Sequence, residues 1–265
     1  MRAAASPKWF QLYVHPDRGL TSELIGRAEA AGYSALVCTV DTPVIGRRER
    51  DLKNGFVLPF RPSPRTVFDV ARHPSWLLGW LAEGRFAAGN LAALKPRAPE
   101  GMSDFEWIMA DPSVTPETLR WIRSIWKGPL LAKGILTVRD ALLAQDCGVD
   151  GVIVSNHGGR QLDCVAASIT ALPDIAAAVA SDMVVLLDGG VRRGSDVLKA
   201  LSLGATAVLV GRPWLWGAAA GGEEGIQLVL HLLRNELLTA LALMGRPSLA
   251  EVDETCIRHA TRAAV

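Results

Sequence analysis

The feature that most constrains the fold of this chain is a repeated alternation of short apolar runs with longer segments of helical periodicity. The apolar runs are rich in β-branched residues, and they end in polar residues or glycine. Runs that are apolar along their whole length are typical of parallel strands with both faces of the sheet covered, so the fold class is α/β. The predicted strands are Trp9–Val14, Ala35–Thr39, Leu130–Lys133, Gly151–Ser155, Val184–Asp188 and Ala207–Val210. The predicted helices are Leu20–Ala31, Glu117–Ile125, Val138–Gln145, Ile169–Ala180 and Asp196–Leu203.

Two architectures fit this alternation: an open doubly wound sheet and a closed (β/α)8 barrel. An open sheet concentrates its functional residues at one switch point, whereas a barrel spreads them over all strand ends. Polar residues stand at or just beyond every predicted strand end: Gln11, Tyr13, Thr39, Asp41, Lys133, Ser155, His157, Asp188, Gly211 and Arg212. The sequence therefore favours a single barrel domain over residues 1–265. Since it offers about six of the eight strands and opens almost directly on one, we expect the deficit at the N-terminus.

The connection between the second and third predicted strands is unusually long and contains an insertion over residues 57–108. Loops of this length are usually functional or mobile. Within it, Trp76, Leu77, Trp80 and Leu81 would share one face of a short helix. The segment from Val57 to Glu100 carries six Lys/Arg against three Asp/Glu. A lid or subunit-interface helix and an interfacial membrane patch are both open interpretations.

Composition excludes several classes of protein. With 49% hydrophobic and 21% charged residues, the chain is globular, and a net charge of +1 gives no argument for a nucleic-acid partner. The four cysteines are scattered, without a CxxC pair, which argues against a zinc site or a disulfide framework and suits a reducing cytoplasm. We predict no metal site, and no apolar run reaches the length of a membrane span.

The strongest functional signal is the string SNHGGRQ at residues 155–161, which follows a predicted strand. His157 can accept a proton near neutral pH, and the planar guanidinium of Arg160 suits a carboxylate. The two residues stand three apart in a glycine-rich loop, so both can reach one small ligand. The alternative, a histidine that only stabilises a turn, leaves the rest of the string unexplained.

A second signal is the string DGGVRRG at residues 188–194. A glycine pair lets backbone N–H groups approach an anion, and arginine neutralises its charge. Together with Gly211 and Arg212 after the last predicted strand, it predicts a phosphate site built from the final two loops, where barrels often bind phosphate.

Three further residues are weaker candidates. Lys133 ends an apolar strand, so its ammonium could stabilise negative charge at the barrel mouth; an ion pair with a neighbouring carboxylate is the alternative. Asp41 could orient His157, or it could cap a loop. Arg48 could be a second carboxylate ligand, but it lies in a charge run, GRRERD, of the kind that is usually a solvated surface.

The sequence resembles the family of FMN-dependent 2-hydroxy-acid oxidases and dehydrogenases. The matching strings are WFQLYV, TVDTPVIGRRERDLKNGF, AKGI, GVIVSNHGGRQLD, LLDGGVRRGSDVLKALSLGA and VLVGRP, which run through almost all of the chain. The string HPSWLLGWL in the insertion is most similar to the mandelate and membrane-linked lactate dehydrogenase branch, where this segment is associated with the membrane. The family's first two barrel strands, with their flavin contacts, have no counterpart here.

The resemblance implies a role for each candidate. His157 would be the base and Asp41 its support, while Arg160 and Arg48 would bind the substrate carboxylate. Tyr13 would contact the substrate oxygen and the cofactor, and Lys133 would stabilise the reduced flavin. Whether His157 takes the α-proton or the hydroxyl proton stays open. The residues implied in FMN binding are Gln11, Tyr13, Thr39, Lys133, Ser155, Asp188, Gly189, Gly190, Val191, Arg192, Gly211 and Arg212.

The resemblance also implies the reaction: oxidation of an (S)-2-hydroxy acid, lactate-like or mandelate-like, to the 2-oxo acid. A membrane quinone or a cytochrome would accept the electrons if the insertion binds a membrane, and oxygen would do so otherwise. Relatives imply a homotetramer, located in the cytoplasm or peripherally on the inner face of the cell membrane. Two rival hypotheses remain: a non-catalytic barrel fragment that binds no flavin, and a non-redox phosphate-binding barrel such as an isomerase or aldolase. The second leaves His157, Arg160 and Arg48 without a common task.

Overall fold

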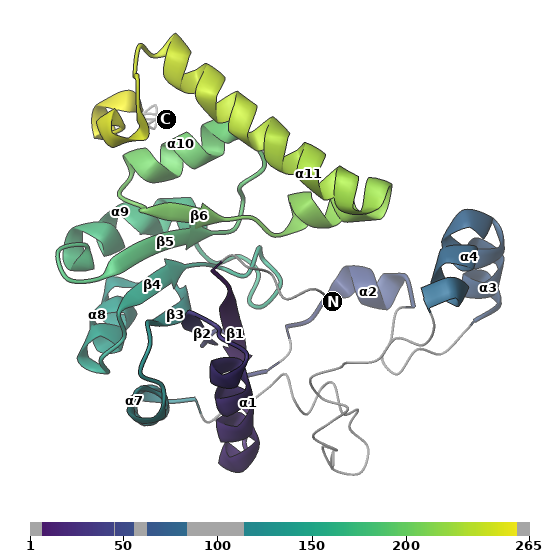
Figure 1. The fold of residues 1–265 in the computed structure, drawn as a ribbon, viewed down its shortest axis with the longest axis horizontal. Helices are drawn as coiled ribbons and strands as arrows, with labels where there is room; N and C mark the ends of the chain where they lie inside the picture. The colour runs from purple at the N-terminus through teal and green to yellow at the C-terminus, as the bar shows by residue number, and fades with distance from the viewer. Residues whose placement is uncertain (1–6, 45, 56–62, 84–113, 259–265) are drawn as a thin grey trace.

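The computed structural model describes residues 7–44, 46–55, 63–83 and 114–258, and within them six strands form one parallel sheet in sequential order. The sheet curls, and its helices lie on the outside (Figure 1). A doubly wound sheet would reverse its strand order and carry helices on both faces. The arrangement is therefore that of a (β/α)8 barrel, of which the described residues supply six strands. The strands are β1 Trp9–Tyr13, β2 Ala35–Thr39, β3 Leu130–Ile135, β4 Gly151–Val154, β5 Val184–Asp188 and β6 Ala207–Leu209.

The helices that cover the outer face agree with the predicted segments to within two residues at each end. They are α1 Arg18–Ala30, α7 Pro116–Ile125, α8 Val138–Asp146, α9 Ser168–Val179 and α10 Gly194–Ser202. Side-chain caps fix some of their starts: Asp17 Oδ1 accepts from Gly19 N at 2.8 Å, and Thr137 Oγ1 accepts from Asp140 N at 3.1 Å. The sequence analysis did not identify α2 Glu49–Lys53, α3 Pro64–Ala71, α11 Arg212–Leu243, or the 3-10 turns Leu249–Glu251 and Glu254–Cys256.

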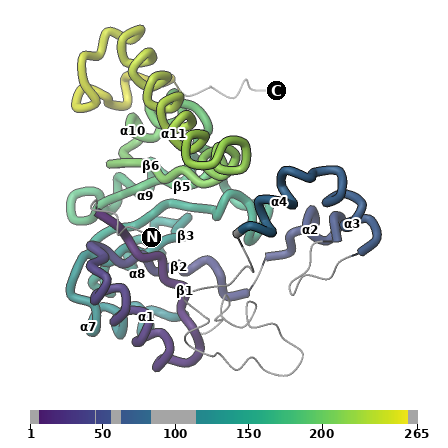
Figure 2. Tube along the Cα trace, turned by 45° about the vertical axis from the view of Figure 1, so that its right-hand side comes forward, coloured from purple at the N-terminus to yellow at the C-terminus, as the bar shows by residue number. Residues whose placement is uncertain are grey.

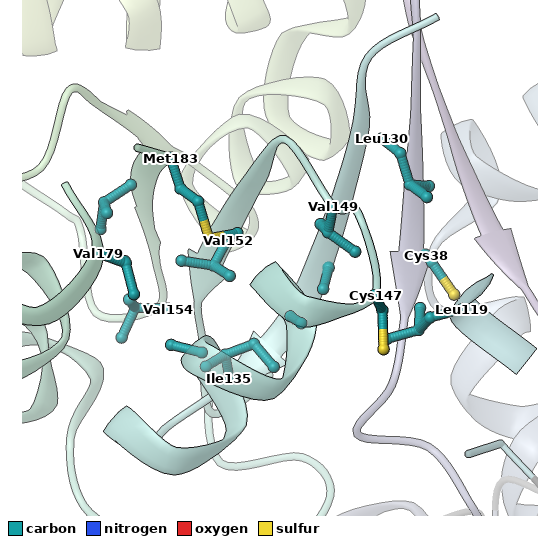
Figure 3. Close-up of a cluster of buried hydrophobic side chains, with 14 of the residues drawn as sticks. Cys38, Leu119, Leu130, Ile135, Cys147, Val149, Val152, Val154, Val179 and Met183 are labelled. Carbon is teal, nitrogen blue, oxygen red and sulfur yellow. The ribbon is translucent and has the colours of Figure 1, made fainter. Parts of the chain in front are cut away.

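Alternate residues of strands β2 to β6 belong to two different cores, because successive side chains of a strand point to opposite faces. The outward residues pack against the helices in a large cluster, part of which is seen in Figure 3, where Val152 and Val154 of β4 lie near Val179 of α9. The inward residues form a smaller cluster in the interior of the curl. Its members are Ala35, Val37, Leu131, Ile153 and Leu186, with Leu209 packed against them.

Helix α11 is long but not continuous. Gly221 and Gly222 depart from helical angles, so the helix is kinked there. Its second part is fixed to α10, since Glu236 accepts hydrogen bonds from Gly194 N at 2.8 Å and from Arg193 at 2.7 Å. Among the described helices, α11 alone has the length and apolar composition of a membrane span. Its kink and its attachment to α10 are features of a helix that packs on the barrel.

Helices α3 and α4 form a unit that stands off from the sheet (Figures 1 and 2). Helix α4, Pro74–Glu83, confirms the short helix predicted in the insertion. Trp76 and Trp80 stack on its surface with ring centroids 6.4 Å apart, and both are about half exposed (57% and 50%). The other parts of the predicted insertion, residues 57–62 and 84–108, lie outside the described residues.

Candidate active site

Polar side chains replace apolar ones where the inward face of the sheet reaches the carboxyl ends of the strands. Each of these side chains lies two residues beyond a member of the inner cluster, and therefore points to the same face. The positions are Thr39, Lys133, Ser155 and Asp188, which follow Val37, Leu131, Ile153 and Leu186. The inner core thus ends in a layer of polar groups at the mouth of the curl, which is where barrel enzymes carry their active sites.

Ser155 links two charged groups in this layer. Its Oγ donates to Asp188 Oδ2 at 2.6 Å and accepts from Lys133 Nζ at 3.1 Å, and Lys133 Nζ also lies 2.6 Å from Asp188 Oδ2. Burial opposes ionisation of Asp188, but the charge of Lys133 and the hydrogen bonds from Lys133 and Ser155 outweigh it and lower the pKa of the Asp188 carboxyl. The ion pair that the sequence left as an alternative for Lys133 is therefore present, in the same place as the predicted cofactor contact.

Asp41 and His157 come together although 116 residues separate them. Nδ1 of His157 lies 3.1 Å from both carboxylate oxygens of Asp41. The backbone N–H of His157 donates to Ser155 Oγ at 3.0 Å, and His157 has a φ of 55°, a left-handed conformation that is uncommon outside glycine. Such backbone conformations persist where surrounding contacts enforce them, often at functional sites. Because Asp41 occupies Nδ1, Nε2 is the nitrogen left to exchange a proton with a ligand.

Gly134 makes room for Asp41. The register between β3 and β4 shifts between Lys133 and Ile135, and Gly134 has a φ of 108°. A Cβ at this position would lie 2.6 Å from Cγ of Asp41. The irregularity in β3 therefore lets the carboxylate of Asp41 approach the mouth of the curl, which only glycine allows here.

Strands β1 and β2 contribute a second polar group. Gln11 Nε2 donates to Thr39 Oγ1 at 2.9 Å and to the hydroxyl of Tyr13 at 3.2 Å. Burial is the largest cause that raises the pKa of the Tyr13 hydroxyl above its ordinary value, and the negative charge of Asp41 adds to it. Arg48 and Arg160 act on Tyr13 in the opposite direction, so both arginines lie within electrostatic reach of it.

Arg48 and Arg160 are like charges within electrostatic reach of each other, and Asp51 offsets this repulsion at Arg48 only in part. Nε of Arg48 is buried and has no hydrogen-bond partner, and among the described residues neither guanidinium is within salt-bridge distance of an acidic side chain. Burial, followed by the positive charge of Arg160, lowers the pKa of Arg48. Two guanidinium groups held close together at a cost in repulsion are suited to bind an anion, and a planar carboxylate fits them best.

The predicted phosphate loops line a cleft of about 400 Å³. Gly158, Gly189 and Gly190 of its lining all have positive φ angles, and Arg212 at the start of α11 donates to Gly158 O at 2.7 Å. Lys199 of α10 also lines the cleft. Nothing in the sequence pattern distinguished Lys199 from an ordinary surface residue of an amphipathic helix.

The residues predicted to bind phosphate are not all free to do so through their backbone. The N–H groups of Arg192 and Arg193 both donate to Asp196 Oδ2, at 3.1 and 3.0 Å. The guanidinium of Arg192 lies 5.9 Å from the ring of Trp216. An open space adjoins Gly211, where a Cβ would meet nothing within 4 Å. The start of α10 is therefore capped from within the chain, which leaves the glycines and the arginine side chains for an anion.

Comparisons with a family model and with individual proteins point to the same family of enzymes. The sequence model of a family described as FMN-dependent dehydrogenase matches residues 1–259. A 2-hydroxyacid oxidase of Dictyostelium discoideum is 44% identical over 252 residues, and an L-lactate oxidase of a Nostoc strain is 47% identical over 251 residues. These alignments cover 95% and 94% of this chain but 59% and 63% of the relatives. The chain thus spans about three fifths of the length of these two proteins.

Solved structures named as a mandelate dehydrogenase and mandelate oxidases also match this chain. The structure of a monotopic membrane protein, (S)-mandelate dehydrogenase, superposes with a TM-score of 0.84 at 38% identity, covering 95% of this chain and 67% of that one. A mandelate oxidase matches with a TM-score of 0.74 at 41% identity, covering 92% of this chain and 62% of that one.

Proposed function

Because the chain belongs to the FMN-dependent dehydrogenase family, we propose that it binds FMN at the mouth of its curled sheet and oxidises a small (S)-2-hydroxy acid to the 2-oxo acid. The observation that carries this proposal is the pairing of Asp41 with His157 beside two arginines that form no salt bridge within the described part of the chain. A proton acceptor next to a carboxylate-binding pair is what such a substrate requires. The non-redox phosphate-binding barrel gives these groups no common task.

The residues present fit FMN. A cleft lined by glycines and Arg212 suits a phosphate group, and Lys133 provides a buried cation in the polar layer nearby. Gln11, Thr39 and Lys133 would contact the flavin ring, with Ser155 and Asp188 holding Lys133 in place. The bound flavin supplies the two-electron acceptor.

The remaining chemistry falls to the side chains of this chain. Arg48 and Arg160 bind the carboxylate of the substrate, and Tyr13 donates to its oxygen. His157 takes a substrate proton at Nε2, while Asp41 holds Nδ1 and stabilises the positive charge that forms on the imidazole. Lys133 would place a positive charge beside the flavin ring, where it would favour the negatively charged reduced cofactor. Each residue thus acts on charge that develops during the reaction.

The substrate we propose is lactate-like or mandelate-like. Relatives named for lactate and structures named for mandelate support both, and they do not distinguish a dehydrogenase from an oxidase. The electron acceptor is a quinone or a cytochrome if the protein binds a membrane, and oxygen otherwise.

An absorbance spectrum of the purified chain tests this function. We expect flavin bands to stay with the protein after FMN is added and the unbound cofactor removed by gel filtration, and we expect them to bleach on anaerobic addition of L-lactate or (S)-mandelate. A protein that stays colourless with added FMN would contradict the proposal and support the non-catalytic fragment. Bands that persist with both acids would refute the substrate class while leaving the cofactor in place.

We also propose that α3 and α4 bind a membrane surface. Trp76 and Trp80 are exposed at one helix face, and Leu81 (60% exposed) and Phe68 (64% exposed) extend the apolar surface. Arg72 lies against the ring of Phe68, which places a cation beside the apolar group. Aromatic and basic side chains together are typical of helices that lie in a membrane interface.

The membrane proposal is tested by flotation with vesicles that contain anionic lipid. Replacement of Trp76, Trp80 and Leu81 by serine should move the protein from the vesicle fraction to the soluble fraction. The matched control replaces the exposed Leu142 and Leu143 of α8 by serine, which should not change the distribution. If the first variant floats like the parent, a lid or a subunit-interface helix becomes the better interpretation.

A further inference from the structure

We propose that Gln161 and Gly46 fasten the loop after β2 to the loop after β4, and that Gln161 is a positioning residue of the site. The first loop carries Asp41 and Arg48, and the second carries His157 and Arg160. This inference rests on the proposed function, since its consequence is the geometry of the substrate-binding groups.

The side-chain amide of Gln161 bonds to three backbone groups of the facing loop. Its Nε2 donates to Asp41 O at 3.3 Å and to Val44 O at 3.1 Å, and its Oε1 accepts from Gly46 N at 3.4 Å. Both amide hydrogens are therefore used, together with one lone pair of the oxygen. No ionisable group takes part, so the link does not depend on pH or on salt.

Gly46 lets the two loops approach closely. A Cβ at this position would overlap the backbone carbonyl of Arg160 and would lie 2.6 Å from Cα of Gln161. Both contacts are with backbone, which cannot move aside as the end of a flexible side chain can. Any larger residue at position 46 must therefore push the loop after β2 away from the loop after β4.

The fastening opposes a repulsion that the site itself creates. Arg48 and Arg160 are like charges, and burial of Arg48 adds to the cost of holding them together. Among the described residues neither guanidinium forms a salt bridge, and Asp51 offsets only part of the cost at Arg48. Neutral hydrogen bonds from Gln161 hold the loops in place before the anion arrives, so the binding geometry is formed in advance.

The experiment uses the full chain loaded with FMN and compares two changes at the fastening. Gln161→Ala removes the amide, and Gly46→Ala retains the amide but separates the backbones. In both variants we expect faster amide hydrogen exchange in residues 41–48, measured by mass spectrometry, and a dissociation constant for oxalate that rises roughly tenfold. FMN retention and Tm should stay near those of the parent, which a general loss of structure would not allow.

Two control variants separate positioning from the loss of any glutamine or glycine. Gln145→Ala removes an amide on α8, outside both loops, that bonds to Asp182 at 3.2 Å, and Gly26→Ala adds a methyl group where nothing lies within 4 Å. Both should exchange and bind oxalate like the parent. Gln161→Glu keeps the size but places a carboxylate against two carbonyl oxygens, so it should not restore oxalate binding.

The outcomes separate this inference from the proposed function. If Gln161→Ala leaves both the exchange of residues 41–48 and the oxalate affinity within twofold of the parent, the fastening is refuted. If the parent itself neither binds oxalate nor bleaches with hydroxy acid, the proposed function fails, while faster exchange in the two variants still supports the fastening.

Discussion

Two sets of charged residues meet at the mouth of the sheet, and they differ in how their charges are balanced. The strand-end cluster, Lys133, Ser155 and Asp188, is self-contained: each polar group has a partner within the cluster at 2.6 to 3.1 Å. The loop arginines, Arg48 and Arg160, repel each other, and neither forms a salt bridge among the described residues; Asp51 offsets the repulsion at Arg48 only in part. The same small region thus contains one neutralised cation and two that are not.

This difference in charge balance assigns stability to the strand-end cluster and ligand binding to the loop arginines. Lys133 is buried at the end of a strand, and an unpaired charge there would destabilise the fold, so Asp188 must balance it. The loop arginines are nearer to water and can remain unpaired until a ligand binds. We therefore expect changes in the loops to alter binding and rate at constant stability, and changes in the strand-end cluster to alter stability.

The largest expected effect is on the rate and comes from the loop after β4. His157→Gln should bind FMN but lose roughly two to four decades of turnover with lactate or mandelate, the usual range for a general base. Its Tm should stay near that of the parent, because Asp41 is the one hydrogen-bond partner of the His157 side chain among the described residues. Steady-state kinetics together with thermal melting measure both. Turnover close to that of the parent would remove His157 from the mechanism.

The next effect is on binding and comes from a loop arginine. Arg160→Met should raise KM or the oxalate dissociation constant by about one to two decades, the range for a hydrogen-bonded charge pair. The Tm should stay constant or rise, because the repulsion of Arg48 is relieved. Arg50→Met in α2 is the matched control and should change neither value. A fall in Tm without a change in KM would contradict this comparison, because it would show that Arg160 contributes to stability and not to binding.

Much of this arrangement could be predicted from the sequence, because the apolar runs and the polar residues at their ends carry the strand signal directly. All six strands and the pairing of Asp41 with His157 were expected. Helix α11 was not, since its apolar residues run on through the glycine pair at its kink without a boundary. Arg48 was assigned through family resemblance alone, because a charge run does not reveal which of its arginines is buried.

Other contacts gave no signal in the sequence at all. The amide of Gln161 bonds to backbone groups more than 100 residues away, and backbone groups are the same in every sequence. The requirement for glycine at position 134 depends on where Asp41 lies in space. These features follow from the approach of two loops, which local patterns do not specify.

Gly134 follows Lys133 of the strand-end cluster and lies against Asp41 of the loop after β2. Its replacement should therefore affect both stability and turnover, each by an intermediate amount. Gly134→Ala forces alanine into a φ of 108° and against Asp41, whereas Gly32→Ala forces it into a φ of 71° with nothing within 4 Å. The strain alone costs about 1 kcal/mol, or about 2–4 °C in Tm, in each variant. Only Gly134→Ala should also lower turnover, because it displaces the partner of His157. Equal turnover in the two variants would show that Asp41 tolerates the displacement.

The smallest expected effect is a pH dependence that belongs to the strand-end cluster alone. Because Lys133 and Ser155 lower the pKa of Asp188 despite its burial, the carboxylate stabilises the fold above the ordinary carboxyl pKa of about 4. That contribution is lost as the pH falls through the lower value of the folded state. The difference in Tm between the parent and Asp188→Asn should therefore be largest near neutral pH and shrink below about pH 4.

The control for this pH dependence is Asp174→Asn, an exposed position on α9, which should show no such convergence. A second comparison uses Lys133→Met, in which the pKa of Asp188 loses its main support and burial then raises it. In that variant stability should instead rise as the pH falls toward the raised pKa of Asp188, because protonation removes a buried charge that has lost its partner. If the parent and Asp188→Asn differ by the same amount from pH 3 to pH 7, the charge of Asp188 does not stabilise the cluster. In that case the expectation that Lys133 needs the charge of Asp188 for stability, whereas the loop arginines need no such partner, would be wrong.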